Sequence, residues 1–286
     1  AMSIMLPRAN VAALRIDEVL KTEVSIQDPE TPVHPPESVK GEIEFDHVSF
    51  ASPEAGENVL TDISFKAKKG QTIAVIGSTG SGKSTLINLI PRYYDVTKGS
   101  VKVDGVDVRD MTQKELRDKL GYVPQKGVLF SGTIDSNIRY GKPEITDAQV
   151  KEAAEVAQAT EFIDTKPEKY ESPVSQGGTN VSGGQKQRLS IARAIAKDPK
   201  IYLFDDSFSA LDFKTDSQLR KALKEYTKDA TTVIVAQRIS TILGADQIIV
   251  LDDGHMAGIG THKELMANCE VYQQIARSQL SEEEMA

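Results

Sequence analysis

The stretch that decides the fold is GSTGSGKST, residues 77–85, which matches the pattern G-x-x-x-x-G-K-[ST]. Its glycines let backbone N–H groups turn toward phosphate oxygens, while Lys83 suits the terminal phosphates and the Ser84 hydroxyl suits Mg²⁺. The pattern predicts a site for a nucleoside triphosphate. The residues expected to bind this nucleotide are Gly77, Ser78, Thr79, Gly80, Ser81, Gly82, Lys83, Ser84 and Thr85.

The sequence on both sides of this stretch supports the prediction. QTIAVIG, residues 71–77, is nearly all apolar and β-branched, as in a strand that is covered on both faces. TLINLI, residues 85–90, then continues in a pattern suited to a helix. A phosphate-binding loop requires this order of strand, loop and helix.

A second apolar run, IYLFDDSFSALD at residues 201–212, ends in two adjacent aspartates. A phosphate-binding loop needs a carboxylate at the end of a neighbouring strand to hold Mg²⁺, and Asp205 is expected to supply it. Asp206 has two interpretations from the residues alone. It is either the base that orients water or a second solvated acid at the end of a strand.

The composition bounds the class of protein. A chain of 286 residues, 39% apolar and 27% charged, suits one large domain or a domain with a subdomain. No apolar run approaches the roughly 20 residues of a membrane-spanning helix, and no signal peptide pattern is seen, so we expect any membrane role to come through a partner. The single cysteine, Cys269, excludes an internal disulfide and favours a cytosolic location. The net charge of −8 argues against nucleic acid as a partner.

The chain begins with a lead-in and continues as one domain. Residues 5–23 have helical spacing, and a proline-rich linker follows, so residues 1–40 are expected to precede the domain at 41–280, with a tail at 281–286. Apolar strands alternate with helical segments, which predicts an α/β fold with a parallel sheet and crossover helices. The predicted strands are 41–50, 59–67, 71–77, 201–204, 231–236 and 247–251, and the predicted helices include 146–163, 185–197 and a last helix with a capping box at 261–264.

NVSGGQKQR, residues 180–188, resembles the signature motif of ATP-binding cassette (ABC) proteins, and a helix-like run, LSIARAIAKDP, follows it. Three further motifs occur in the family's order: YVPQ with Gln125 as the glutamine loop, SALD with Asp212 as the D-loop, and VIVAQRIST with Gln237 at the switch loop. The resemblance covers residues 41–280 and is closest to the nucleotide-binding domain of an ABC exporter. Residues 8–23 resemble the connection that such proteins make from their last membrane helix.

The resemblance implies a P-loop (RecA-like) core around a mostly parallel sheet. It also implies a small antiparallel β subdomain from residues 41–70 and 99–110, and an α-helical subdomain at about 127–183. Family members pair so that two domains sandwich two ATP molecules, each held by one partner's P-loop and the other's signature. The expected partners are therefore a second nucleotide-binding domain and the membrane-spanning domains, at the cytoplasmic face of a membrane.

The resemblance also assigns roles to residues. Asp206, Gln237 and Gln125 are the expected catalytic residues, and Ser84, Gln125 and Asp205 the expected Mg²⁺ ligands. The expected contacts to the partner's ATP are Ser182, Gly183, Gly184 and Gln185. Because Ser182 and its glycines precede a helix, they offer free N–H groups, a hydroxyl and the positive end of the helix dipole to a phosphate.

Four positions depart from the family pattern. Asp206 replaces the usual catalytic glutamate and is shorter by roughly 1.5 Å, and a misplacement of about 1 Å can cost on the order of a hundredfold in rate. Gln237 replaces a histidine, Ser52 an aromatic residue that stacks on adenine, and Gln176 a glutamate that contacts membrane domains. These departures predict one half of a heterodimeric exporter, whose own P-loop site is degenerate and slow and whose signature completes the partner's site.

Three other interpretations remain. A regulatory module would bind ATP and dimerise with little hydrolysis, which Asp206 and Gln237 favour for the isolated chain. A soluble ABC ATPase of DNA repair or translation would usually carry a coiled-coil insertion or a second cassette, and neither is present. An importer ATPase is usually a separate chain without the lead-in seen here.

Overall fold

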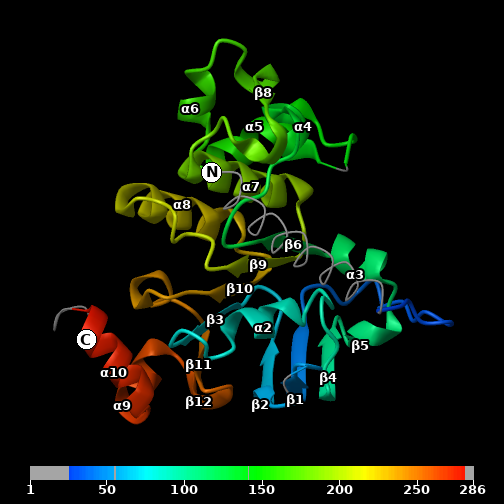
Figure 1. Cartoon of the computed structure of the whole chain (residues 1–286), viewed down its shortest axis with the longest axis vertical. Helices are drawn as coiled ribbons and strands as arrows, with labels where there is room; N and C mark the ends of the chain where they lie inside the picture. Colours follow the sequence, from blue (N-terminus) through cyan, green and yellow to red (C-terminus); the bar gives the residue numbers. More distant parts are fainter. Residues whose placement is uncertain (1–25, 55, 141, 281–286) are drawn as a thin grey trace, which may run out of the picture.

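A six-stranded sheet forms the centre of the molecule in this computed structural model, which describes residues 26–54, 56–140 and 142–280 (Figure 1). Five strands run parallel and one antiparallel strand, β12, closes an edge. The order is β12 (His255–Gly260), β11 (Gln247–Asp252), β3 (Thr72–Gly77), β10 (Thr231–Val235), β9 (Ile201–Asp205) and β6 (Leu120–Val123). The prediction of a mostly parallel sheet is confirmed.

The strands of this sheet are buried on both faces, as their continuous apolar runs predict. Along β9, Ile201 and Leu203 point into one apolar cluster, whereas Tyr202 and Phe204 point into another. The first cluster also holds the helix that follows the phosphate-binding loop, α2 (Lys83–Asn88), and the second holds the helical part of the chain. Because alternate side chains of a strand point to opposite faces, the same sheet contributes to both apolar clusters.

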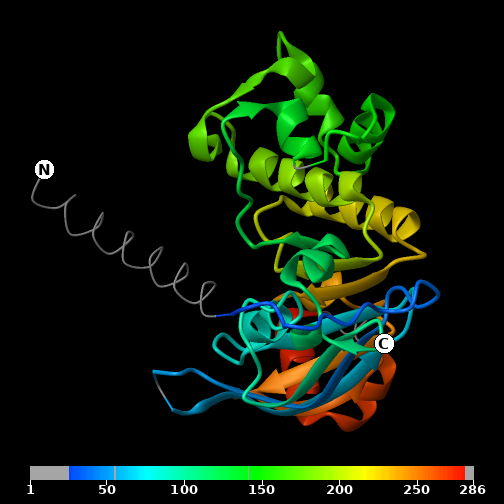
Figure 2. The ribbon, with the colours of Figure 1, turned by 90° about the vertical axis from the view of Figure 1, so that its right-hand side faces the viewer.

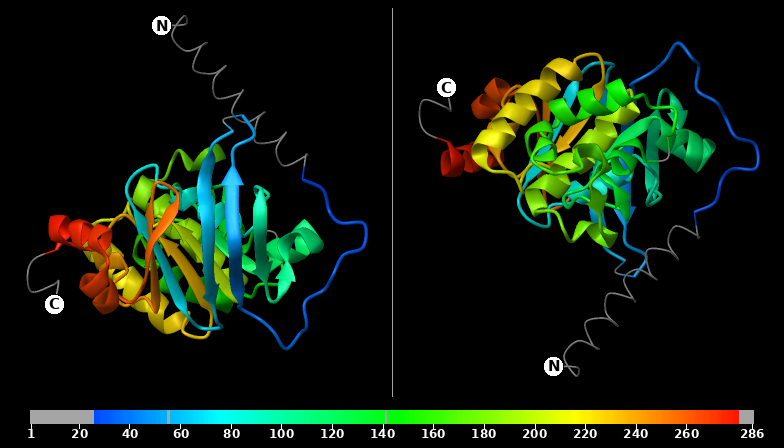
Figure 3. Two further views of the ribbon diagram at one scale, coloured as in Figure 1. Left: turned by 90° about the horizontal axis from the view of Figure 1, so that it is seen from below. Right: turned by 90° about the horizontal axis from the view of Figure 1, so that it is seen from above.

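A four-stranded antiparallel sheet covers the first cluster. Its order is β2 (Asn58–Ala67), β1 (Ile43–Ala51), β4 (Lys98–Val103) and β5 (Val106–Asp107), as predicted for residues 41–70 and 99–110. Phe45 and Phe65 stack across β1 and β2 with ring centres 4.6 Å apart. Strand β2 lies beside β12, so the two sheets adjoin (Figure 3).

The helical part stands apart from the antiparallel sheet (Figure 1). It contains α4 (Ile134–Arg139), α5 (Asp147–Val156), α6 (Thr160–Asp164) and the start of α7 (Gly183–Lys197). A short ladder of β7 (Gly132–Thr133) with β8 (Pro173–Val174), which the sequence analysis did not predict, closes it. The predicted helix at 146–163 is wrong in its continuity, because Gln158 adopts a left-handed conformation and separates α5 from α6.

The remaining helices cover the sheets and the connections. They are α3 (Gln113–Asp118), α8 (Phe213–Tyr226), α9 (His262–Asn268), α10 (Glu270–Gln279) and the 3₁₀ turns Val108–Asp110, Lys169–Glu171, Gln176–Gly178 and Ile239–Thr241. The capping box at Thr261 and Glu264 is confirmed, but the predicted last helix is broken at Cys269 into α9 and α10. None of the helices in the described parts of the chain is long and apolar enough to span a membrane.

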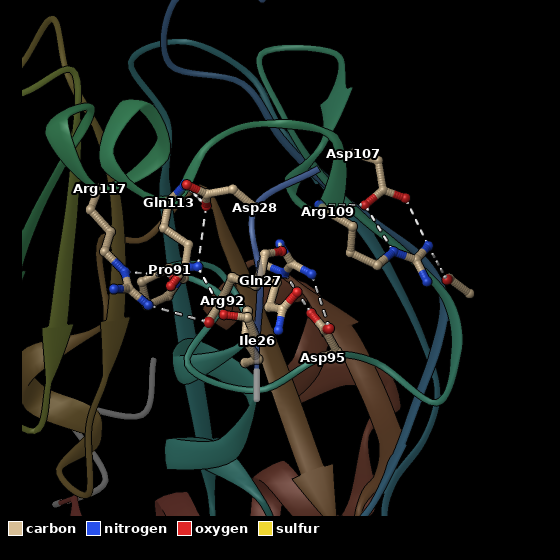
Figure 4. A network of polar contacts seen from close by, with 11 residues as sticks. Ile26, Gln27, Asp28, Pro91, Arg92, Asp95, Asp107, Arg109, Gln113 and Arg117 are labelled. Atoms are coloured by element: carbon tan, nitrogen blue, oxygen red, sulfur yellow. Dashed lines mark hydrogen bonds and ion pairs between the residues drawn. The ribbon is translucent and has the colours of Figure 1, made fainter. Parts of the chain in front are cut away.

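Residues 26–34 run along the surface of the domain before β1 begins at Ile43 (Figure 2). Gln113 fixes this strap, because its side chain donates to the carbonyl of Ile26 and to Asp28, and its backbone N–H also donates to Asp28 (Figure 4). Arg92 donates to the carbonyl of Gln27 at 3.1 Å. The predicted helix at 5–23 and the tail at 281–286 lie outside the described residues.

Candidate functional site

The phosphate-binding loop links β3 to α2 and is shaped by its glycines. Gly82 has a φ of 103°, and a Cβ there would lie 2.7 Å from the Leu60 side chain. A Cβ on Gly77 would lie 2.4 Å from the carbonyl oxygen of Leu251. Only glycine satisfies both positions, so the two glycines that the sequence pattern fixes are required by conformation and by space.

Lys83 is folded back onto the loop in this structure. Its ammonium group donates to the carbonyl oxygens of Gly77 at 2.6 Å and Ser78 at 2.9 Å. Burial lowers the pKa of Lys83, and the nearby charges of Asp206 and Asp205 oppose that effect. A buried cation whose partners are neutral carbonyls suits an anionic ligand, because phosphate oxygens would form stronger, charge-assisted hydrogen bonds with it.

Ser81 adds a second sign that the loop is built for a ligand. Its hydroxyl is buried and has no hydrogen-bond partner among the described residues. Its backbone is held on both sides, since its N–H donates to Ser78 and its carbonyl accepts from Gly254. A buried polar atom without a partner is costly, and a bound phosphate oxygen would relieve that cost.

The expected magnesium ligands Ser84 and Asp205 meet in the structure. The Ser84 hydroxyl donates to Oδ1 of Asp205 at 3.1 Å, because β9 ends beside the loop. Burial raises the pKa of the Asp205 carboxyl, while the Ser84 hydrogen bond and the Lys83 charge oppose that rise. A hydroxyl and a carboxylate are oxygen ligands that suit Mg²⁺ together with phosphate oxygens. Among the described residues, no group of three or more His, Cys, Asp or Glu side chains is arranged to hold a metal ion, so this is not an all-protein metal cage.

Asp206 lies next to Asp205 but faces different partners. It has a φ of 51°, a conformation that aspartate tolerates better than most residues, and its N–H donates to the carbonyl of Val235 at 2.8 Å. The Gln125 amide donates to Oδ2 of Asp206 at 3.2 Å. Gln125 therefore reaches the expected base, and no hydrogen bond joins it to Asp205 in the described structure.

The charge of Asp206 is disfavoured by its surroundings. Burial raises the pKa of its carboxyl, and the neighbouring Asp205 raises it further. A hydrogen bond from Ser209 and the charges of Lys83 and Arg238 act in the opposite direction. The pKa values of both adjacent carboxyls are thus raised, as expected for acids that share a partly buried site.

The switch loop follows β10 and lies beside Asp206. Gln237 is exposed and lines a small hollow together with Asp206, Ser209 and Arg238. No side-chain hydrogen bond of Gln237 is formed within the described residues. Its amide is therefore available to a ligand, although it cannot carry the positive charge of a histidine.

Residues that the sequence analysis missed hold the glutamine loop in place. The Gln187 side chain, 1% exposed, accepts from the N–H of Gly127 at 2.7 Å and donates to the carbonyl of Pro124 at 3.0 Å. The buried Ser207 hydroxyl donates to the carbonyl of Val123 at 2.7 Å. Gln187 stands inside the signature run at 180–188, which is the one signal that could have identified it.

The signature residues lie at the start of α7, as predicted. Ser182 is the N-cap: its hydroxyl accepts from the N–H of Gln185, and the Gln185 side chain accepts from the N–H of Ser182. Ser182 and Gly183 are exposed, and a Cβ on Gly183 would touch nothing within 4 Å. In the described parts of the chain, no hydrogen bond or ion pair joins these residues to the phosphate-binding loop.

Three other predicted positions are placed as follows. Ser52 begins the loop after β1, and its backbone carbonyl accepts a hydrogen bond from the N–H of Gly56. The serine side chain has no ring that could stack on adenine. Gln176 is exposed on the helical part. Asp212 is the N-cap of α8, with its carboxylate on Thr215, and these hydrogen bonds lower the pKa of the carboxyl.

Comparisons with known proteins agree with this arrangement. A family model described as ABC transporter matches residues 60–209. An uncharacterized ABC transporter ATP-binding protein of Mycobacterium tuberculosis is 48% identical over 278 residues, which cover 96% of this chain and 47% of that protein. A putative multidrug export ATP-binding/permease protein of Staphylococcus aureus is 46% identical over 241 residues, covering 84% of this chain and 42% of that protein.

A solved structure of a bacterial Atm1-family ABC exporter with ATP bound has a TM-score of 0.84 and 37% identity. It covers 90% of this chain and 45% of the exporter chain, so the present chain spans about half the length of the proteins that it matches. The family model covers 150 of the 286 residues, from the second strand through both aspartates. This chain belongs to the ABC transporter family.

Proposed function

We propose that the chain is the ATP-binding and ATP-hydrolysing domain of an ABC exporter, located at the cytoplasmic face of a membrane. It closes around ATP with a second nucleotide-binding domain, while membrane-spanning domains of the same transporter carry the substrate. The proposal is supported by the Lys83, Ser84 and Asp205 arrangement, which fits Mg²⁺ and a triphosphate. It is also supported by relatives that are about twice as long and are described as export proteins.

The P-loop face consists of the residues expected around this chain's own nucleotide, namely Lys83, Ser84, Gln125, Asp205, Asp206 and Gln237. These residues have different roles. Lys83 would bind the terminal phosphates, and Ser84 and Asp205 would hold Mg²⁺, which supplies the charge that stabilises the transferred phosphoryl group. Gln125 and Gln237 would lie near the terminal phosphate, because both are close to Asp206. Asp206 would orient the attacking water. This division explains why two carboxylates stand side by side at the end of β9.

The same face is expected to turn over slowly, and the observation that carries this is the placement of Asp206. Its left-handed backbone is tied to Val235, and its carboxylate is already engaged by Gln125. A side chain that is one methylene shorter than glutamate falls short of the water position by roughly 1.5 Å. Gln237 cannot compensate with a positive charge, so we infer a degenerate site.

The signature would act on a nucleotide that is held by another molecule. Ser182, Gly183 and Gly184 form the N-terminus of a 15-residue helix, where backbone N–H groups and the helix dipole favour a phosphate. Ser182 and Gly183 are exposed and Gly184 is half-buried, and among the described residues no hydrogen bond or ion pair joins them to this chain's own P-loop. We infer that they complete the site of a partner subunit, which makes the exporter a heterodimer with one slow and one competent site.

An exposed aromatic patch suits the membrane-spanning domains. Phe130 and Tyr140 stack with ring centres 4.5 Å apart, and their side chains are 40% and 55% exposed. Val128, close to Phe130 in sequence, is 50% exposed. The Arg193 guanidinium lies 5.2 Å from the centre of the Phe130 ring. The patch begins three residues after Gln125, so a domain docked there would be coupled directly to the Asp206 site.

A regulatory module that binds ATP and hardly hydrolyses it is the second candidate, and the observation that favours it is again Asp206 with Gln237. The two candidates differ in what the signature does. A regulatory module would bind ATP without accelerating a partner, whereas an exporter subunit would increase the partner's turnover.

The test is steady-state ATP turnover of this chain alone at saturating Mg-ATP over a series of protein concentrations. We expect nucleotide binding with turnover far below the typical enzyme value, on the order of 10 s⁻¹, at every concentration. Turnover that climbs to that value as the chain pairs with itself would contradict a degenerate site and a requirement for a different partner.

A further inference from the structure

The last residue of α10 contacts the backbone of the switch loop. The Gln279 side chain donates from Nε2 to the carbonyl oxygen of Gln237 at 2.9 Å. Its Oε1 accepts from the N–H of Ile239 at 2.8 Å. One amide therefore binds the backbone on both sides of Arg238, although 40 residues or more separate it from the loop.

The contact with Ile239 satisfies a donor that would otherwise lack a partner. Ile239 begins the 3₁₀ turn Ile239–Thr241, and the side chain of its N-cap, Arg238, does not cap it. Ile239 is fully buried, so its N–H has little access to water. Since the first N–H groups of a helical turn need partners from outside the turn, Gln279 supplies the missing cap.

The position of Gln279 is fixed by apolar packing beneath it. Tyr272 and Ala276 of α10, and Leu280 directly after it, lie in the same buried cluster as Ile239 and Ile242. The helix end is thus packed against the turn that it caps. The amide contact is formed on a rigid base, which is what a residue that positions another residue requires.

The other side of the switch loop is held by α8. Arg238 lies 3.7 Å from Asp216, a buried residue of α8, and donates to the carbonyl of Ser209 at 3.5 Å. The loop is therefore held between α8 and α10. The Gln237 side chain itself forms no hydrogen bond within the described structure.

We propose that Gln279 is a positioning residue for the switch loop. Through the backbone of Gln237 it sets where the Gln237 amide meets the terminal phosphate, which makes the C-terminal helix a part of the nucleotide site. This inference rests on the proposed function, because it assumes that Gln237 faces the terminal phosphate of ATP bound to this chain.

The experiment compares the affinity for ADP with that for a non-hydrolysable ATP analogue by calorimetry with Mg²⁺. We expect the wild-type chain to prefer the ATP analogue, and Gln279→Leu to reduce this preference about fivefold, as for one lost hydrogen bond, with ADP affinity unchanged. Gln273→Leu is the matched control, because Gln273 lies on the same helix and its amide donates to a carbonyl of Met266, away from the switch loop.

A second variant separates positioning from simple capping. Gln279→Glu keeps an acceptor for the Ile239 N–H but places a carboxylate against the Gln237 carbonyl. We expect it to unfold at or above the unfolding temperature of Gln279→Leu, because the Ile239 N–H keeps its acceptor, and yet to lose the preference for the ATP analogue. A wild-type preference in either Gln279 variant overturns the inference, while the proposed function stands. A wild-type chain that binds ADP and the analogue equally overturns the inference, and one that binds neither overturns both.

Discussion

The P-loop face and the signature face, which consists of Ser182, Gly183, Gly184 and Gln185, differ in how their ligand-binding groups are paired within the chain. On the P-loop face, Lys83 and Ser84 each have hydrogen-bond partners within the chain before any ligand arrives. On the signature face, Ser182 caps its own helix, while Gly183 is exposed with open space around it. The polar groups of the first face are paired within the chain, whereas in the proposed function the second face would meet a nucleotide that another molecule holds.

This difference teaches where the departures from the family pattern matter. Asp206 and Gln237 both belong to the P-loop face, and none of the signature residues departs from the pattern. A chain with an altered P-loop face and an intact signature would lose rate at its own nucleotide and keep its effect on a partner's nucleotide. The predictions below separate the two faces, beginning with the largest expected effect.

Removing the lysine of the P-loop face should cause a large loss of nucleotide affinity. Lys83→Ala loses a buried ammonium group that we expect to form charge-assisted hydrogen bonds with phosphate, so affinity for Mg-ATP should fall by about a hundredfold or more, about 2.7 kcal/mol. Calorimetric titration measures this, with Lys69→Ala as the control at an exposed lysine. An unchanged affinity in Lys83→Ala would refute the assignment of the loop.

Changing the signature should leave this chain's own affinity intact and slow its partner. Ser182→Asp retains a good helix cap but places a negative charge where a partner's phosphate would arrive. We expect wild-type Mg-ATP affinity in the isolated chain. Turnover of the assembly with the partner domain should fall on the order of a hundredfold. Ser182→Thr, which keeps both cap and hydroxyl, is the control. Equal losses in the isolated chain and the assembly would place the signature and the P-loop in one site.

The magnesium requirement should depend on pH through Asp205. Because burial raises the pKa of this carboxyl, it takes up a proton at a higher pH than an exposed aspartate near 3.9. Mg²⁺ needs the ionised form, so the gain in ATP affinity from Mg²⁺ should be largest near neutral pH and should decrease as the pH is lowered. Titrations with Mg²⁺ and with chelator, compared with Asp205→Asn, measure it. An Asp205→Asn variant with the same pH dependence would rule Asp205 out as the cause.

The smallest expected effect concerns the backbone of Asp206. Its φ of 51° suits aspartate better than glutamate, so Asp206→Glu should lower the free energy of unfolding by roughly 0.5 to 1 kcal/mol. Asp206→Asn should avoid this loss, because asparagine also tolerates the left-handed conformation. Denaturant unfolding of the two variants measures the difference, and a more stable Asp206→Glu protein would contradict the backbone argument.

Features that depend on neighbouring residues could be predicted from the sequence. The phosphate-binding loop, the strand that ends in Asp205 and the helix capped by Ser182 are each contained in a short run, and the structure has all three. The breaks at Gln158 and Cys269 were missed, because helical periodicity continues through both positions.

Contacts between distant residues could not be predicted in the same way. Gln187 holds Gly127 from 60 residues away, and Gln279 holds Gln237 from 42 residues away. A glutamine on a helix usually points to solvent, so the sequence around Gln187 or Gln279 gives no indication that its side chain binds a distant backbone group. The sequence did predict that Gln125 and Asp206 would share a site, but only through the family resemblance.

The most direct test of the central claim restores the family residues on the P-loop face. Steady-state turnover at saturating Mg-ATP is compared between the wild-type chain and the Asp206→Glu, Gln237→His double variant at identical concentration. A rise on the order of a hundredfold is predicted, because the restored carboxylate regains roughly 1.5 Å of reach and the histidine regains its charge. Wild-type turnover that is already fast, or that falls in the double variant, would contradict a site held back by these two positions.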